Sequence, residues 1–100
     1  MQQITVLGST GSIGGNTLDV IARHPDRFSV FALSASTQVD LMLAQCAQFK
    51  PRFAVMAHED AGRRLADKVA AEGLKVEVRW GAEALLDISE HPDVDAVMAA

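Results

Sequence analysis

The sequence predicts an α/β fold in which a doubly wound parallel sheet is covered by helices on both faces. Apolar runs typical of strands alternate with stretches that repeat apolar residues at helical spacing, and the connections between them are short. A glycine-rich turn also separates the first apolar run from the first helical stretch. Because strands joined through helices pair in parallel by right-handed crossovers, these observations favour a single layered sheet.

Composition narrows the class of protein further. The 100-residue chain has 49% hydrophobic and 22% charged residues and a formal net charge of -4, which is typical of one globular domain and does not favour a nucleic-acid partner. Its single cysteine, Cys46, excludes an internal disulfide and agrees with a reducing compartment. There is no basic leader and no apolar stretch of membrane-spanning length, so we expect a cytoplasmic protein without a membrane partner.

The most informative stretch is the turn that follows the apolar run 3–7. Gly8 suits a sharp turn after a strand, Gly11 a close approach of the backbone to a pyrophosphate, and Gly14 tight packing of the next helix. The amides at that helix N-terminus would then face the phosphates. The spacing G-x-x-G-x-x-G is a relative of the dinucleotide fingerprint G-x-G-x-x-G, and a glycine-rich turn without a ligand is the alternative. Hydroxyl donors come from Ser9, Thr10 and Ser12.

The remaining elements follow in order. The first helix continues through Arg23 and ends before Pro25, and the second begins after Thr37, which resembles an N-cap with Asp40 as its acidic partner. Lys50-Pro51 ends the second helix, and Gly73 ends the third as a C-cap. Strands are predicted at 28–35, 53–56, 76–80 and 94–100, and the later helices at 60–72 and 82–90.

With a phosphate turn after strand one, the expected strand order is 3-2-1-4-5 in a Rossmann-like sheet of five strands. The ligand crevice should lie beyond the carboxyl ends of strands one and four. The apolar ending 97–100 has no polar exit, so we expect residues 1–100 to be one nucleotide-binding domain cut from a longer protein.

Residues at the tip of the second strand select between NAD and NADP(H). An acidic residue there selects NAD by accepting from the ribose 2′-hydroxyl, but this chain has no acid until Asp40, which favours NADP(H). Ser36, Thr37 and Gln38 would donate to the 2′-phosphate. For Thr37, a plain capping role is an equal alternative.

Other reactive residues do not converge on the glycine turn. Cys46 lies on the apolar face of its helix and is interpreted as core. The carboxylates at 59–60 begin a helix, and those at 93 and 95 flank a strand start, away from the crevice. We therefore predict no catalytic and no metal-binding residue within this chain. The histidines, interpreted as surface residues, are His24, His58 and His91.

Several motifs together resemble the N-terminal region of 1-deoxy-D-xylulose-5-phosphate reductoisomerase over essentially the whole chain. They are Gly-Ser-Thr-Gly-Ser-Ile-Gly at 8–14, Thr-Leu-Asp-Val at 17–20, His-Pro at 24–25, Val-Phe-Ala-Leu-Ser-Ala at 30–35 and Asp-Val-Asp-Ala-Val-Met-Ala-Ala at 93–100. The resemblance implies a homodimeric enzyme of non-mevalonate isoprenoid biosynthesis. Such an enzyme rearranges a sugar phosphate and reduces it with NADPH to 2-C-methyl-D-erythritol 4-phosphate, using Mg²⁺ or Mn²⁺.

The resemblance also assigns residues. Thr10, Gly11, Ser12 and Ile13 match positions that contact the pyrophosphate, and the segment 36–38 matches the grip on the 2′-phosphate. There the family commonly shows a glycine, then often a basic residue, then asparagine, and this chain has Ser-Thr-Gln. The family's metal-binding acids and substrate-phosphate site lie beyond residue 100, so the fragment alone is expected to be inactive.

Two alternatives stay open from the sequence. One is the NAD(P)-binding domain of another dehydrogenase, of the semialdehyde or homoserine dehydrogenase type. The other is a nucleotide-sensing module without catalysis.

Overall fold

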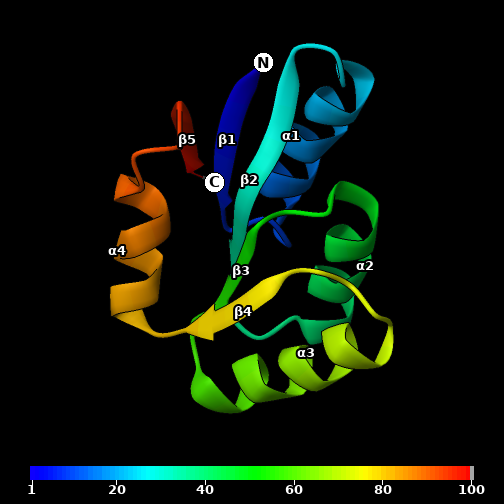
Figure 1. The fold of residues 1–100 in the computed structure, drawn as a ribbon, viewed down its shortest axis with the longest axis vertical. Coiled ribbons are helices and arrows are strands. Elements are labelled where there is room, and N and C mark those ends of the chain that lie inside the picture. Colours follow the sequence, from blue (N-terminus) through cyan, green and yellow to red (C-terminus); the bar gives the residue numbers. More distant parts are fainter. Residues whose placement is uncertain (100) are drawn as a thin grey trace.

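The computed structural model describes residues 1–99 and contains one five-stranded sheet with four helices. The strand order is β4-β3-β2-β1-β5, and every neighbouring pair is parallel (Figure 1). The predicted α/β class and parallel sheet are confirmed. The elements are β1 (Gln2–Leu7), α1 (Ser12–Arg23), β2 (Phe28–Ala35), α2 (Val39–Phe49), β3 (Phe53–Met56), α3 (Glu59–Ala71), β4 (Glu77–Trp80), α4 (Ala82–Glu90) and β5 (Ala96–Ala99).

Helices cover both faces of the sheet. α1, α2 and α3 lie on one face, where Leu18, Met42 and Leu65 belong to the larger cluster of buried apolar side chains (Figure 1). α4 lies on the other face, where Ile88 belongs to a second cluster with Val55 of β3. Because the central strands are covered on both sides, β2 and β3 are apolar nearly throughout and were readable from the sequence.

The third helix ends at a glycine, as predicted. Gly73 takes φ +68, a left-handed conformation that glycine adopts without steric cost. Its N–H donates to the Ala70 carbonyl, and the Leu74 N–H donates to the Val69 carbonyl, both at 3.1 Å. These bonds satisfy carbonyls that the last helical turn would otherwise leave free. α3 itself lies one residue nearer the N-terminus than expected.

The position of strand four differs from the prediction. The order 3-2-1-4-5 places it beside strand one, but β4 pairs with β3 at the sheet edge, and β5 pairs with β1. The order is therefore wrong for the last two strands. The reason lies in the sequence of β4, where Glu77 and Arg79 alternate with Val78 and Trp80. A strand with charged side chains suits a sheet edge, and the apolar β5 forms the other edge of the described sheet, beside β1.

The observed strand order also changes the position of the crevice from the predicted one. Because β5 lies beside β1, the direction of winding reverses between these two strands, and the crevice lies beyond their carboxyl ends. The prediction that it lies beyond strands one and four is wrong. β5 is also shorter than the predicted 94–100, since Asp95 precedes the strand; Ala100 lies outside the described residues.

Candidate functional site

The glycine turn joins β1 to α1 at the carboxyl edge of the sheet. Gly8 has φ +71, so the first glycine of the motif takes the left-handed conformation that a sharp turn needs. The turn closes when the Gly11 N–H donates to the Gly8 carbonyl at 3.1 Å. α1 begins immediately afterwards at Ser12, so its N-terminus opens onto the crevice.

Gly14 is required by packing within the chain itself. A Cβ placed on Gly14 would lie 2.2 Å from the Gly8 carbonyl oxygen and 2.7 Å from the Ser9 Cα. Both atoms belong to the backbone of the turn, which cannot swing aside as a side chain can. The packing role that the sequence predicts for Gly14 therefore has a clear steric basis. Gly15, one residue on, has no atom within 4 Å of such a Cβ.

Gly11 differs from Gly14 in what constrains it. As the N-cap residue of α1 it has φ -81 and ψ 172, an extended conformation open to any residue. A Cβ placed on Gly11 would have the Gly8 oxygen as its nearest neighbour, at an ordinary contact distance of 3.5 Å. Nothing in residues 1–99 demands glycine here, whereas a ligand that approaches the backbone closely would.

The first turn of α1 is open to an anion. No side chain in the described part of the chain caps it, and it carries no acidic residue. Unpaired N–H groups and the positive end of the helix dipole favour negative charge at such a terminus. Thr10 is half-buried beside it, and Ser12 and Ile13 are exposed, Ile13 by 64%. These residues lie in or directly before the first turn of α1.

Ser9 does not supply a hydroxyl to this surface. Its side chain is fully buried, with Oγ 4.0 Å from the Met42 sulfur. The Ser9 N–H donates to the Ser34 carbonyl at 2.8 Å, and the Ser9 carbonyl accepts from the Gln45 side chain at 2.8 Å. The expectation that Ser9 is a phosphate donor is wrong, because this residue ties the turn to β2 and α2 instead.

The segment after β2 also departs from one prediction. Ser36, Thr37 and Gln38 are all exposed at the carboxyl edge of the sheet. The N-cap of α2 is Gln38, without a side-chain capping bond, so the predicted capping role of Thr37 is wrong. The Val39 N–H instead donates to the Thr37 carbonyl at 2.9 Å, and Gln38 has φ -80 and ψ 78. This inverse γ-turn starts the helix one residue late and leaves the Thr37 hydroxyl without a capping bond.

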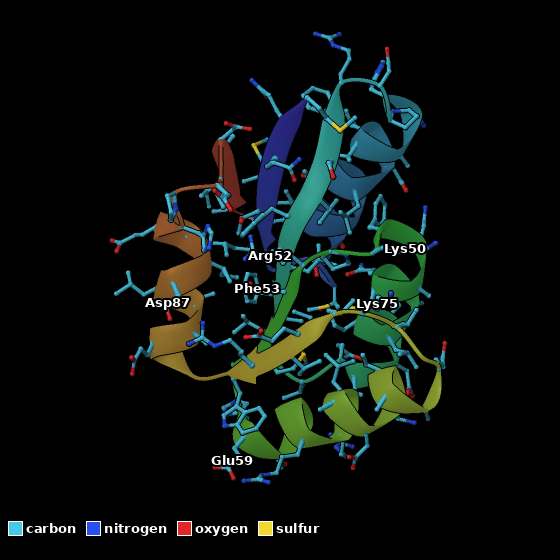
Figure 2. All side chains as sticks on the ribbon, in the orientation of Figure 1. Lys50, Arg52, Phe53, Glu59, Lys75 and Asp87 are labelled. Carbon is cyan, nitrogen blue, oxygen red and sulfur yellow. The ribbon has the colours of Figure 1, made fainter. Side chains whose placement is uncertain are left out.

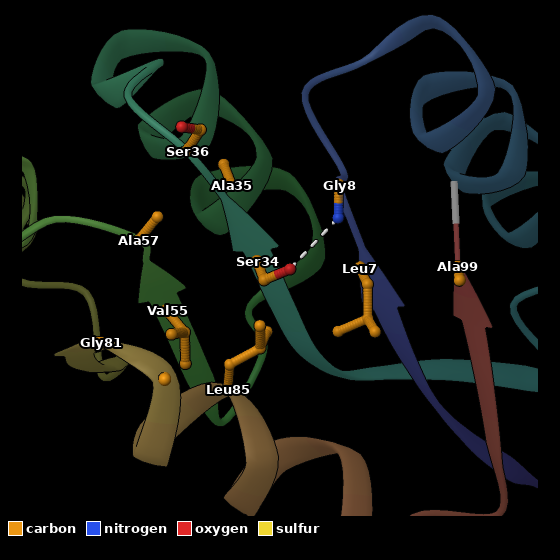
Figure 3. A pocket seen from close by; sticks show the side chains of 11 residues that line it. Leu7, Gly8, Ser34, Ala35, Ser36, Val55, Ala57, Gly81, Leu85 and Ala99 are labelled. Atoms are coloured by element: carbon orange, nitrogen blue, oxygen red, sulfur yellow. Dashed lines mark hydrogen bonds between the residues drawn. The ribbon is translucent and has the colours of Figure 1, made fainter.

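A cavity of about 550 Å³ lies along the same edge. Its walls come from the carboxyl ends of β1, β2 and β3, the start of α4 and the end of β5 (Figure 3). Ser34 and Ser36 supply its two side-chain hydroxyls, and the rest of the lining is apolar or glycine. Two residues predicted to bind the cofactor, Gly8 and Ser36, line this cavity. The other predicted residues lie outside its lining: Thr10, Gly11, Ser12, Ile13, Gly14, Thr37 and Gln38. Its lining residues are Leu7, Gly8, Ser34, Ala35, Ser36, Val55, Ala57, Gly81, Ala82, Leu85 and Ala99.

The acidic residues at 93 and 95 lie at the opposite ends of the strands, where β1 and β3 begin. Asp93 pairs with Arg52, which precedes β3, at 3.0 Å, and Figure 2 shows Arg52 near the start of that strand. The Asp95 carboxylate accepts from the Gln3 N–H at 2.7 Å, at the start of β1. These contacts confirm that both carboxylates lie away from the crevice.

Cys46 is a core residue, as predicted. It is fully buried, and burial raises the pKa of its thiol from 9.0 to about 11, which keeps it protonated and unreactive at neutral pH. Among residues 1–99 no three His, Cys, Asp or Glu side chains gather as a metal site would require. No described helix is long and apolar enough to cross a membrane.

A parallel sheet that reverses its winding beside β1, with a glycine turn leading into α1, defines a Rossmann-like α/β domain. Comparison with known proteins makes the assignment specific. The family model described as 1-deoxy-D-xylulose 5-phosphate reductoisomerase matches residues 4–100. The chain belongs to this family.

Individual relatives agree with the family. The chain is 55% identical over 100 residues to the 1-deoxy-D-xylulose 5-phosphate reductoisomerase of Dechloromonas aromatica (strain RCB) and 54% identical to that of Ralstonia nicotianae (strain ATCC BAA-1114 / GMI1000). All of this chain is covered in both comparisons, but it spans only 25% of each relative.

Solved structures give the same result. A crystal structure of DOX-P reductoisomerase in complex with NADPH, fosmidomycin and magnesium matches 97% of this chain and 24% of its own, with a TM-score of 0.93 and 36% identity. The enzyme from Zymomonas mobilis in complex with NADPH matches 92% of this chain and 24% of its own, with a TM-score of 0.85 and 36% identity.

Proposed function

We propose that this chain is the NADPH-binding part of a longer enzyme that converts 1-deoxy-D-xylulose 5-phosphate to 2-C-methyl-D-erythritol 4-phosphate in isoprenoid biosynthesis. Family membership supports the reaction, and the solved relative bound to NADPH and magnesium supports the cofactors. The observation in this chain that carries the proposal is the uncapped N-terminus of α1 behind Gly11, where no side chain blocks an approaching anion.

In this proposal the residues of the glycine turn hold the cofactor. The pyrophosphate accepts hydrogen bonds from the backbone N–H groups of the segment 10–13 (Thr10, Gly11, Ser12 and Ile13) and from the hydroxyls of Thr10 and Ser12. Gly8 and Gly14 set the shape of the turn. NADPH supplies the hydride for the reduction. This chain binds and orients it, whereas the groups that hold the sugar phosphate belong to the rest of the enzyme.

The tip of β2 sets the choice of nucleotide. Ser36 lines the cavity, Thr37 and Gln38 follow it as exposed residues, and none of the three carries a carboxylate that would repel a 2′-phosphate. The Thr37 hydroxyl makes no capping bond, which leaves it free to donate to that phosphate.

The divalent metal, the dimer and the cytoplasmic location belong to the same proposal. The described residues offer no cluster of metal ligands, so they do not fit a metal ion, and we route no step through one. We expect Mg²⁺ or Mn²⁺ to be held by other parts of the enzyme. The family resemblance is the basis for a homodimer and a cytoplasmic location, and the net charge of -4 is the basis for expecting no nucleic-acid partner.

Substitution of Gly11 tests the proposal. In the full-length enzyme, Gly11→Val should weaken NADPH binding at least about tenfold, because the new side chain projects from the N-cap toward the pyrophosphate. Circular dichroism should show an unchanged fold, since Gly11 has an ordinary φ and a Cβ there would meet the Gly8 oxygen at an ordinary contact distance of 3.5 Å. Gly15→Ala, in the same helix, is the control and should bind normally. Unchanged NADPH affinity in Gly11→Val, measured by calorimetric titration, would refute the assigned role.

A further inference from the structure

Ser34 of β2 holds two consecutive amides where β1 leaves the sheet. Its hydroxyl oxygen accepts from the Gly8 N–H at 3.1 Å, a contact drawn as the dashed line in Figure 3, and its carbonyl accepts from the Ser9 N–H at 2.8 Å. The regular β1–β2 pairing ends at Val6 and Leu33. The Ser34 side chain therefore supplies an acceptor for Gly8 that a neighbouring apolar residue would not.

Gln45 of α2 holds the same turn from the other side. Its Nε2 group donates to the Ser9 carbonyl at 2.8 Å. Its Oε1 atom is buried and has no hydrogen-bond partner in the described part of the chain. The donor group of Gln45 thus fixes the Ser9 peptide against α2.

We propose that Ser34 and Gln45 are positioning residues for cofactor binding, which fix the Gly8–Ser9 segment and thereby aim the amides of α1 at the pyrophosphate. Gly8 is conformationally permissive, so without these bonds the turn would sample other conformations. A ligand would then have to order the turn on binding, which weakens affinity. The inference rests on the proposed function, because it assumes that the turn binds NADPH.

Paired variants of the full-length enzyme test the inference. Ser34→Ala and Gln45→Met each remove one hydrogen bond with little change of volume. Each should raise the NADPH dissociation constant and KM about tenfold while kcat at saturating NADPH stays within about twofold. Ser34→Thr keeps the hydroxyl and should retain most of the affinity. Ser29→Ala in β2 and Gln48→Met in α2 have no bond to the turn and should match the wild type.

Two results of the binding measurements would overturn the inference: wild-type NADPH affinity in both Ser34→Ala and Gln45→Met, or an equal loss in Ser34→Thr and Ser34→Ala. Hydrogen exchange of the Gly8 amide in the free enzyme gives a readout that needs no cofactor. It should become faster in Ser34→Ala but not in Ser29→Ala, and unchanged exchange would also count against the positioning role. If the wild-type enzyme fails to bind NADPH while this exchange difference appears, the proposed function is wrong and the anchoring of the turn is right.

Discussion

At the scale of single residues, the three motif glycines meet different physical constraints. Gly8 is fixed by a positive φ, and Gly14 by a backbone clash that any Cβ would cause. Gly11 has neither constraint, and its proposed role depends on the ligand. A motif that looks uniform in the sequence therefore combines structural and binding requirements.

Gly14→Ala should destabilise the protein by about 2 kcal/mol or more, because the new Cβ would overlap the Gly8 carbonyl. Gly15→Ala should instead stabilise it by about 0.5–1 kcal/mol, since it removes glycine from a helix where space is open. Thermal denaturation of the two variants measures the contrast. Equal melting temperatures would contradict the steric argument for Gly14.

Ser36→Asp should shift the cofactor preference from NADPH toward NADH. A carboxylate at this exposed position beside the cavity would repel a 2′-phosphate and accept a hydrogen bond from a 2′-hydroxyl. The measurement is the ratio of kcat/KM for the two cofactors, with Ser36→Asn as an uncharged control. An unaltered ratio in Ser36→Asp would remove this residue from the site.

At the scale of elements, a close contact between α3 and β4 supports the edge of the sheet. A Cβ on Gly62 of α3 would lie 2.5 Å from Cε3 and 2.9 Å from Cβ of Trp80. The Trp80 Cβ is attached to the strand backbone, so rotation of the indole alone cannot relieve the overlap. The Arg63 guanidinium also lies over this indole, 5.3 Å from the ring. Glycine at position 62 thus sets how closely the helix approaches the strand.

Gly62→Ala should therefore lower stability by about 1–3 kcal/mol and change the fluorescence of Trp80 in the isolated domain, where it is the only tryptophan. Gly15→Ala is the matched control, because it makes the same substitution in a helix where space is open. Denaturation curves and emission spectra of the two variants provide the comparison. A Gly62→Ala variant with wild-type stability and emission would show that α3 shifts freely on the sheet.

Prediction from sequence succeeded where a local pattern determines the structure. The range of β2 follows from its continuous apolar character, and the start of α1 from the glycine turn. The place of β4 failed because pairing partners are distant in the sequence, although the alternation at Glu77 and Arg79 was a readable sign of an edge strand. Chain order alone does not say which later strand lies beside β1.

At the site, the sequence indicated which segments lie there better than it indicated where their side chains point. Ser9 and Thr37 were assigned roles from residue type, but their side chains are directed by packing and by the backbone turn before α2. Ser34 and Gln45 were missed as supports of the turn. Each is a polar residue within an apolar segment. Such a residue indicates that a buried hydrogen bond is needed, but it does not identify the partner.

At the scale of the whole molecule, the glycine turn and the tip of β2 both lie at the carboxyl ends of the strands, where residues of each line a cavity. The most direct test of the central claim is a crystal structure of the full-length enzyme with NADPH bound. We expect pyrophosphate oxygens within about 2.7–3.2 Å of backbone N–H groups in the segment 10–13. A pyrophosphate bound elsewhere, with these amides facing only solvent, would contradict the claim.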